Sequence, residues 1–286
     1  MRALVFGRTG QVATELQRRC PGDWQLTALG RDDADLTDPA ACAAIIAGAD
    51  ADVIINAAAY TAVDRAESEP DLAFQVNAAA PGAMAKAAAR AGIPFVHLST
   101  DYVFDGTGQT PWKPEEETCP FGVYGQSKRD GEVAVAGAGG PHVILRTAWV
   151  FSAHGQNFVK TMRRLAADHD TLRIVGDQVG GPTPAAAIAD AVYAIAEHLR
   201  RGAPGQGIHH FAGQPDVSWA GFARAIFART GHSVEVVDIP TTDYPTPAAR
   251  PLNSRLDCRT LETDFGLARP DWREGLDAVL DELGAP

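Results

Sequence analysis

Short apolar runs alternate with longer segments of helical spacing through the first half of the chain. The predicted strands occupy residues 3–6, 25–29, 53–55, 95–98 and 142–145, and the first of them, Ala3-Leu4-Val5-Phe6, is apolar throughout. Continuous apolar runs of this length are typical of strands buried on both faces of a parallel sheet. The helical spacing lies between them, at residues 10–19, 40–47, 70–91 and 124–136. This alternation predicts an α/β fold with a doubly wound parallel sheet.

The pattern becomes less regular beyond Thr147. Helical spacing returns at residues 157–167, 184–200, 219–230 and 272–283. We expect a first domain over residues 1–150, with residues 172–202 packing back onto it. Residues 151–171 and 203–286 are expected to form a smaller, mixed second domain.

Composition and charge exclude several classes of protein. Apolar residues make up 45% and charged residues 21%, as in ordinary globular proteins. The formal net charge of −11 argues against a nucleic-acid partner, because such binding depends on neutralising phosphates. No apolar run is long enough to span a bilayer. The first predicted strand begins at Arg2, so we expect no N-terminal targeting segment. We therefore expect a cytoplasmic protein without a membrane partner.

A glycine turn follows the first predicted strand. Gly7 permits a tight turn, and Gly10 lets the backbone approach the phosphates of a dinucleotide. The helix that follows offers its N–H groups and the positive end of its dipole. The expected contacts within this turn are Gly7, Thr9, Gly10, Gln11 and Val12.

Arg31 stands at the end of the second predicted strand, about twenty residues beyond the turn, where dinucleotide-binding folds recognise the adenosine ribose. An arginine there can pair with the 2′-phosphate of NADP, whereas a carboxylate would bind the ribose hydroxyls of NAD. Arg8, within the turn, can reach the same region. We therefore expect NADPH as the cofactor, while Asp32 and Asp33 leave NADH open. A solvated surface arginine is the alternative interpretation of Arg31.

Tyr124 and Lys128 are spaced i and i+4 on a predicted helix and therefore share one face. A phenol has a pKa near 10, and an ammonium one turn away is expected to lower it and make Tyr124 a usable general acid. Thr100 follows the apolar run at residues 95–98, at the strand end where ligands of parallel sheets bind. We predict that Thr100, Tyr124 and Lys128 are catalytic. A chance pair on a helix surface is the alternative.

Taken together, these motifs resemble the extended short-chain dehydrogenases, which have a Rossmann fold, and within them the dTDP-4-dehydrorhamnose reductases. The narrower resemblance depends on runs such as STDYVF at residues 99–104, RTAWVF at 146–151, DQVGGPT at 177–183 and YPTPAARPLNSRL at 244–256. It implies that NADPH reduces the 4-keto group of dTDP-4-dehydro-L-rhamnose (dTDP-4-dehydro-6-deoxy-L-mannose) to give dTDP-L-rhamnose.

The resemblance also implies a role for each site residue. Tyr124 would donate the proton, Lys128 would contact the nicotinamide ribose, and Thr100 would orient the carbonyl oxygen. The first domain would bind NADP and the second the substrate, a dTDP-linked 4-keto-6-deoxysugar. Further cofactor contacts would be Asp35, Leu36, Ala57, Ala58 and Ala59. Substrate contacts would be Thr100, Asp101, Tyr102, Trp149, Asn157 and Arg250.

Three of these substrate contacts are also supported by residue chemistry. Trp149 follows a predicted strand beside the cleft, although a buried structural tryptophan is an equal alternative. Asn157 could offer its amide to the substrate. Arg250 has a planar fork that matches phosphate oxygens, and it lies in a proline-rich stretch, which favours binding over a solvated charge.

Some members of the family carry Mg²⁺ at a dimer contact, held by a glutamate on the first helix and a second carboxylate. Glu15 matches the first position, whereas Ala186 stands at the second. A single carboxylate holds Mg²⁺ weakly. We therefore expect no metal site, with Glu15 only a weak candidate, and a monomer or at most a weak homodimer.

Two other functions are compatible with the same scaffold. A nucleotide-sugar epimerase or dehydratase is the first, but dehydratases need an acid/base pair, and Tyr102 stands beside Asp101 where a glutamate would be required. A non-catalytic NADP-binding regulatory subunit is the second. It would be expected to have lost the three catalytic residues that this chain retains.

Overall fold

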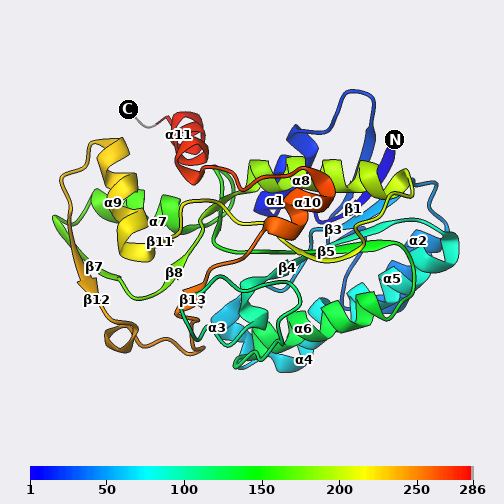
Figure 1. Cartoon of the computed structure of the whole chain (residues 1–286), viewed down its shortest axis with the longest axis horizontal. Coiled ribbons are helices and arrows are strands. Elements are labelled where there is room, and N and C mark those ends of the chain that lie inside the picture. The colour runs from blue at the N-terminus through cyan, green and yellow to red at the C-terminus, as the bar shows by residue number, and fades with distance from the viewer. Residues whose placement is uncertain (285–286) are drawn as a thin grey trace.

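A six-stranded sheet with the strand order β2-β1-β3-β4-β5-β10 forms the centre of the larger part of the molecule (Figure 1). Every neighbouring pair of strands is parallel, which confirms the predicted architecture. The computed structural model describes residues 1–284. The strands are β1 (Arg2–Phe6), β2 (Gln25–Leu29), β3 (Val53–Asn56), β4 (Phe95–Thr100), β5 (His142–Thr147) and β10 (Gly207–His210).

Helices cover both faces of this sheet (Figure 1). On one face α1 packs against α8, and Leu16 and Ile188 join the strand residues in one apolar core. On the other face Ile46, Met84 and Val135 belong to a second core. The helices are α1 (Gln11–Arg18) and α8 (Ala185–Arg200) on the first face, and α2 (Pro39–Ala47), α5 (Ala80–Ala91) and α6 (Val123–Ala136) on the second.

The helix expected over residues 70–91 is divided in the structure. α4 (Pro70–Phe74) and α5 are separated by a π-helical turn at Gln75–Ala79. Pro81 has no N–H and its ring crowds the carbonyl four residues earlier, that of Asn77, so the helix widens there. A Cβ on Gly131 of α6 would stand only 2.0 Å from the Asn77 carbonyl oxygen, so the absence of a side chain permits this close approach. The short α3 (Val63–Ala66) precedes this segment.

The rest of the chain forms a smaller unit with a core of its own, which includes Phe222 and Trp272 (Figure 1). Its sheets have two or three short strands each. The pairs are β7 (Thr171–Val175) with β12 (Glu235–Ile239), and β6 (Val150–Phe151) with β9 (Thr183–Pro184); the triplet is β11 (Val217–Ser218), β8 (Val179–Gly180) and β13 (Asn253–Ser254). Its helices are α7 (Phe158–Ala166), α9 (Trp219–Thr230) and α11 (Trp272–Glu282). Helix α10 (Arg259–Phe265) lies instead beside α8 and β10, and its Leu261 belongs to the first core of the main sheet.

Three segments lie differently from the predicted domain boundaries: α10, which packs on the main sheet, and the strands β10 and β7. β10, within the range assigned to the smaller domain, is the edge strand of the main sheet beside β5. β7, within residues 172–202, pairs with β12 of the smaller unit, although α8 from the same range packs on the main sheet. Each pairing covers a strand edge that would otherwise expose unpaired backbone groups. Because the paired strands lie far apart in the sequence, no nearby sequence motif predicts the pairing.

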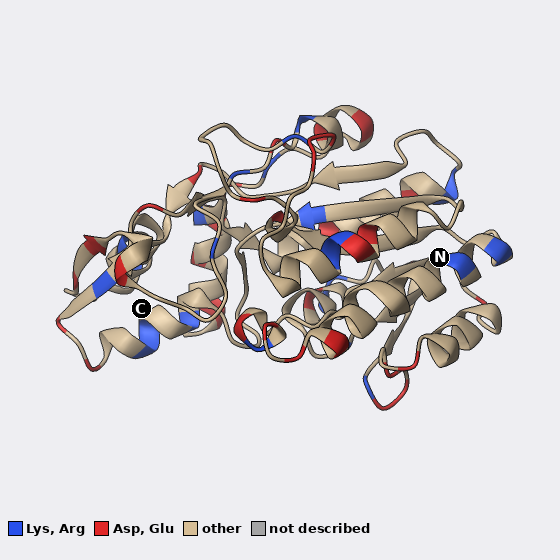
Figure 2. Cartoon of the chain, turned by 90° about the horizontal axis from the view of Figure 1, so that it is seen from below, with Lys and Arg blue, Asp and Glu red and all other residues tan. Residues whose placement is uncertain are grey.

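Among the described residues, no helix is long and apolar enough to cross a membrane. Figure 2 shows Lys and Arg positions interspersed with Asp and Glu positions along the same helices and loops. The net charge of −11 is therefore spread over the molecule, and an anionic ligand depends on local donors.

Candidate active site

A cavity of about 730 Å³ lies at the carboxyl ends of the parallel strands. It spans the point between β1 and β3 where the strand order reverses, the usual ligand site of open α/β sheets. All but two of the predicted cofactor, catalytic and substrate residues line it. They are Gly7, Thr9, Gly10, Gln11, Val12, Arg31, Asp35, Leu36, Ala57, Ala58, Ala59, Thr100, Asp101, Tyr102, Tyr124, Lys128 and Trp149.

The glycine turn has the geometry that a dinucleotide phosphate needs. Gly7 has a φ of +119°, and a Cβ there would lie 3.2 Å from the Ala57 carbonyl carbon and 3.3 Å from the Ala13 Cβ. Gly10 is the N-cap of α1, and a Cβ on it would meet no described atom within 4 Å. The chain therefore needs Gly7 for its own packing, whereas Gly10 leaves room for phosphates at the helix N-terminus.

The two arginines near the end of β2 have different surroundings. Arg8 donates to the Ala28 carbonyl through Nε at 3.2 Å and Nη2 at 3.0 Å, and it also pairs with Asp33. Arg31 is exposed and lines the cavity. Because Arg8 already binds within the turn, Arg31 is the better placed of the two for an added phosphate.

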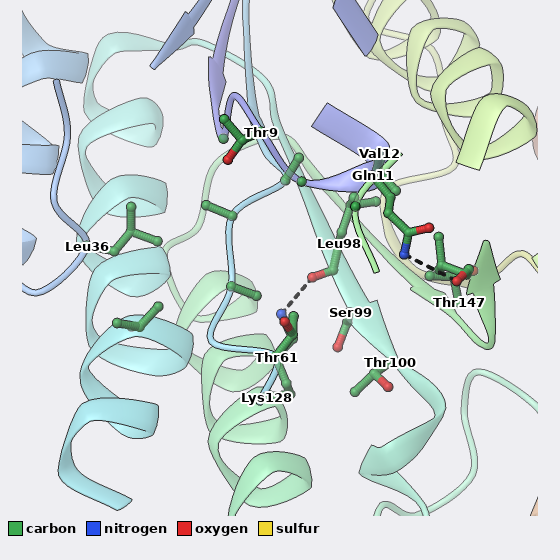
Figure 3. Close-up of a pocket in the computed structure, with 18 of the residues that line it drawn as sticks. Thr9, Gln11, Val12, Leu36, Thr61, Leu98, Ser99, Thr100, Lys128 and Thr147 are labelled. Atoms are coloured by element: carbon green, nitrogen blue, oxygen red, sulfur yellow. Dashed lines mark hydrogen bonds between the residues drawn. The ribbon is translucent and has the colours of Figure 1, made fainter. Parts of the chain in front are cut away.

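Lys128 extends from α6 to the floor of the cavity, as Figure 3 shows. It is only 2% exposed, and its Nζ donates to the Leu98 carbonyl oxygen of β4 at 2.7 Å. Burial lowers the pKa of Lys128 to about 8, although the carboxylate of Glu132 acts in the opposite direction. Lys128 therefore titrates closer to neutral pH than an exposed lysine does.

Tyr124 lies one turn earlier on α6, with its ring 5.4 Å from that of Tyr102. Burial raises the pKa of Tyr124 to about 12, and the charge of Asp101 raises it further. The expected lowering of this pKa by Lys128 is therefore wrong for this arrangement. The Lys128 Nζ is bound to the Leu98 carbonyl, and loss of water around the phenol has the larger effect.

Thr100 and Asp101 lie at the end of β4 and are both buried. The Thr100 hydroxyl donates to Asp101 Oδ1 at 3.1 Å and accepts from the Tyr102 N–H at 3.2 Å. Burial raises the pKa of Asp101 to about 6, while the hydrogen bond from Thr100 acts against this shift. The strand end therefore brings a hydroxyl and a readily protonated carboxyl to the cavity.

Trp149 lines the cavity in a strained conformation. Its φ of +52° is rare for a bulky residue. Its ring stacks on Trp219 of α9 at 3.6 Å and 11°, and the Trp219 indole nitrogen donates to Gln178 Oε1 at 3.1 Å. Trp149 thus joins the cavity to the smaller unit. Trp219 could not be recognised from the sequence, because nothing in its own helix distinguishes it from a core residue.

Asn157 and Arg250 do not line the cavity. The Asn157 amide nitrogen donates to Gln11 Oε1 at 2.9 Å and to the Ser152 carbonyl at 2.7 Å, and its oxygen caps α7 at Lys160. Both amide protons thus have acceptors within the fold, and the predicted contact of Asn157 with the substrate stays a prediction.

Arg250 has partners within the chain. Its Nη2 lies 2.8 Å from Asp64 Oδ2, and its Nη1 donates to the Ala248 carbonyl at 3.0 Å. Its charge also lowers the pKa of Tyr102, which burial raises well above the usual value. Arg250 thus lies near the part of the cavity lined by Tyr102, and its predicted pyrophosphate contact stays a prediction.

Glu15 lies in a cluster of charged side chains that the sequence did not reveal. The His154 Nε2 atom is 3.1 Å from Glu15 Oε1 and 3.6 Å from Glu282 Oε1. These three could offer metal ligands, but Arg18 pairs with Glu282 and lies 4.0 Å from Glu15. The guanidinium therefore supplies positive charge at the place where a cation would stand.

Comparison with known proteins identifies the family. The model described as RmlD substrate binding domain matches residues 1–285. A dTDP-4-dehydrorhamnose reductase of Sinorhizobium fredii is 48% identical over 280 residues, covering 96% of this chain and 95% of the relative. One of Burkholderia thailandensis is 45% identical and covers 99% of each chain.

Solved structures agree with this result. A dTDP-4-dehydrorhamnose reductase from Clostridium acetobutylicum has a TM-score of 0.93 and 36% identity, and covers 99% of this chain and 100% of its own. One from Bacillus anthracis in complex with NADP has a TM-score of 0.92 and 31% identity, and covers 98% and 99%. The protein therefore belongs to the family described by the RmlD substrate binding domain, that of the dTDP-4-dehydrorhamnose reductases.

Proposed function

We propose that this protein uses NADPH to reduce the 4-keto group of dTDP-4-dehydro-L-rhamnose, giving dTDP-L-rhamnose. The observation that carries this proposal is that Thr100, Tyr124 and Lys128 line the same cavity as the glycine turn. The relatives of Sinorhizobium fredii and Burkholderia thailandensis bear the name of this activity, and the Bacillus anthracis protein binds NADP.

The residues present fit a bound NADPH, which supplies the hydride. Gly10 leaves space at the N-terminus of α1 for the pyrophosphate. The exposed Arg31 would make a charge-assisted contact with the 2′-phosphate. Asp35, Leu36 and the alanines of residues 57–59 also line this cavity and are proposed to contact the cofactor. NADH would lack the contact with Arg31 and is expected to bind more weakly.

Tyr124 holds the proton that the reduction consumes. Because its pKa is raised to about 12, the phenol is protonated throughout the neutral range. An alkoxide is a stronger base than a phenolate, so proton transfer from Tyr124 to the developing alkoxide remains favourable. A donor placed where negative charge develops stabilises the transition state more than the ground state.

Thr100 and Lys128 orient the reacting groups. The Thr100 hydroxyl, at the end of β4, would hold the carbonyl oxygen beside Tyr124. Lys128 would hold the nicotinamide ribose from the cavity floor, where the Leu98 carbonyl fixes its Nζ. Asp101, Tyr102 and Trp149 are proposed to contact the substrate, since they line the same cavity. We also propose a cytoplasmic location and a monomer or weak homodimer.

The experiment is to incubate the protein with NADPH and dTDP-4-dehydro-L-rhamnose and to analyse the products. We expect dTDP-L-rhamnose in an amount equal to the NADPH oxidised. An epimerase or dehydratase would convert the sugar without net NADPH consumption, and a regulatory subunit would bind NADPH without turnover. Either of those results would overturn the proposal.

A further inference from the structure

His97 of β4 is a buried histidine that the reaction described above does not use. It is 0% exposed, and its Nε2 atom lies 3.4 Å from the Lys128 Nζ. Its other ring nitrogen, Nδ1, lies 3.1 Å from the Asn56 amide nitrogen at the end of β3. The ring therefore bridges two strands and the lysine at the cavity floor.

The Asn56 side chain determines which nitrogen of His97 carries the proton. The Asn56 Oδ1 atom accepts the Ala58 N–H at 3.2 Å, so the amide presents its NH₂ group to His97. An NH₂ group can only donate, and the His97 Nδ1 atom must therefore accept. Burial holds the pKa of His97 well below its usual value, so the ring is neutral and its single proton is on Nε2.

The Nε2–H group of His97 then points at the Lys128 nitrogen. An ammonium has three donors and no acceptor, so it cannot accept this proton, whereas a neutral amine can. The neutral amine can still donate to the Leu98 carbonyl at 2.7 Å. An ammonium at this place would leave two donors facing each other, or would require Asn56 to turn and lose its bond with Ala58.

We propose that His97 is a positioning residue for Lys128. Its Nε2–H group donates to the Lys128 amine, holds the Nζ atom at the cavity floor and favours the neutral amine over the ammonium. Among the described residues, the charge that acts most on Lys128 is that of Glu132 on the same helix, which favours the ammonium. Glu132 is itself paired with Arg146 of β5 at 2.7 Å. Tyr124 faces the cavity from the preceding turn of α6.

The chain offers a direct test, because its only lysines are Lys86, Lys113, Lys128 and Lys160. Labelling lysine with ¹³C at Cε gives one NMR signal for each, and Lys128→Arg assigns the signal of interest. We expect the wild-type Lys128 midpoint to lie well below the other three. In His97→Asn, the new amide oxygen still accepts from Asn56 but nothing donates to Lys128. Loss of one hydrogen bond should raise the Lys128 midpoint by about half to one pH unit.

Phe95→Leu is the matched control. The Phe95 ring stacks on His97 at 6.3 Å and 12°, so this variant disturbs the packing around the ring and removes no hydrogen bond. We expect its Lys128 midpoint to equal that of wild type. An unchanged midpoint in His97→Asn, or an equal rise in Phe95→Leu, would overturn the proposal.

A second measurement on wild-type protein keeps the proposal testable if His97→Asn fails to fold. Long-range ¹H–¹⁵N spectra, recorded at a pH above the Lys128 midpoint where its amine is neutral, should show His97 protonated on Nε2 and unprotonated on Nδ1. The opposite tautomer would refute the inference. Neither NMR measurement needs substrate, so they succeed or fail independently of the proposed function.

The kinetic consequence does depend on the proposed function. If the ammonium form of Lys128 is the active one, the alkaline fall of kcat/KM reports its titration. In His97→Asn, the midpoint of this alkaline decrease in kcat/KM should move to higher pH by the same half to one unit, because Lys128 then stays an ammonium up to a higher pH. A purely structural role would lower kcat/KM at every pH and leave the midpoint in place, which would contradict the proposal.

Discussion

Replacing Glu132 by glutamine is expected to destabilise the protein by about 3–5 kcal/mol. Glu132 accepts from Arg146 Nε at 2.9 Å and from Nη2 at 2.7 Å, and the side chains are 3% and 2% exposed. It also accepts from the Ser99 hydroxyl at 2.5 Å. Glutamine preserves the shape but leaves the Arg146 guanidinium without a counter-charge in a buried place. The loss of stability comes mainly from this uncompensated charge, and less from any lost contact.

The measurement is urea unfolding followed by circular dichroism, comparing midpoints at unchanged m-value. Glu197→Gln is the control, because Glu197 pairs with Arg201 one helical turn away, with the side chains 45% and 65% exposed. Removing such an exposed pair should cost only about 0.3–0.5 kcal/mol. The double variant Glu132→Gln with Arg146→Met should regain much of the lost stability, since it removes the buried charge as well.

Two results would refute this reasoning. The first is a Glu132→Gln variant no less stable than Glu197→Gln. The second is a double variant as unstable as Glu132→Gln alone, since that would show that packing, and not the unpaired charge, determines the cost.

Further predictions concern catalysis, cofactor choice, metal independence and pH. Tyr124→Phe should lower turnover by roughly 10²-fold or more while NADPH still binds, as steady-state kinetics and fluorescence titration would show; near-normal turnover would exclude Tyr124 as the acid. Arg31→Ala should reduce the NADPH-to-NADH ratio of kcat/KM by roughly 10-fold or more, and a wild-type preference for NADH would contradict this. Because Arg18 lies beside Glu15 and pairs with Glu282, activity and particle size by light scattering should be the same with and without EDTA; a dimer that EDTA dissociates would oppose this. Burial raises the pKa of Asp101 to about 6, so its contribution to stability is lost as the pH rises through that value. The stability of Asp101→Asn relative to wild type should therefore increase between pH 4 and pH 7, by up to about 3 kcal/mol; a constant difference in thermal unfolding would disprove the assignment.

The sequence by itself determined the features that depend on short spacings. Apolar runs long enough for buried strands predicted the parallel sheet, and the glycine turn after β1 predicted where phosphates bind. The i, i+4 spacing of Tyr124 and Lys128 placed both on one face of α6, beside Thr100 at the end of β4. Each of these features depends on residues within one element, or on an element and the turn next to it. Short stretches of sequence are therefore enough to predict them.

Only the tertiary structure decided what lies around those residues. The bridge from Asn56 through His97 to Lys128 joins three elements, and the stack of Trp149 on Trp219 joins two units. The direction of the Tyr124 pKa shift was mispredicted because spacing shows a nearby ammonium but cannot show burial or where the Lys128 Nζ is bound. Burial and hydrogen-bond partners arise from segments that are distant in sequence, and these long-range contacts determine the proton state of each group in the site.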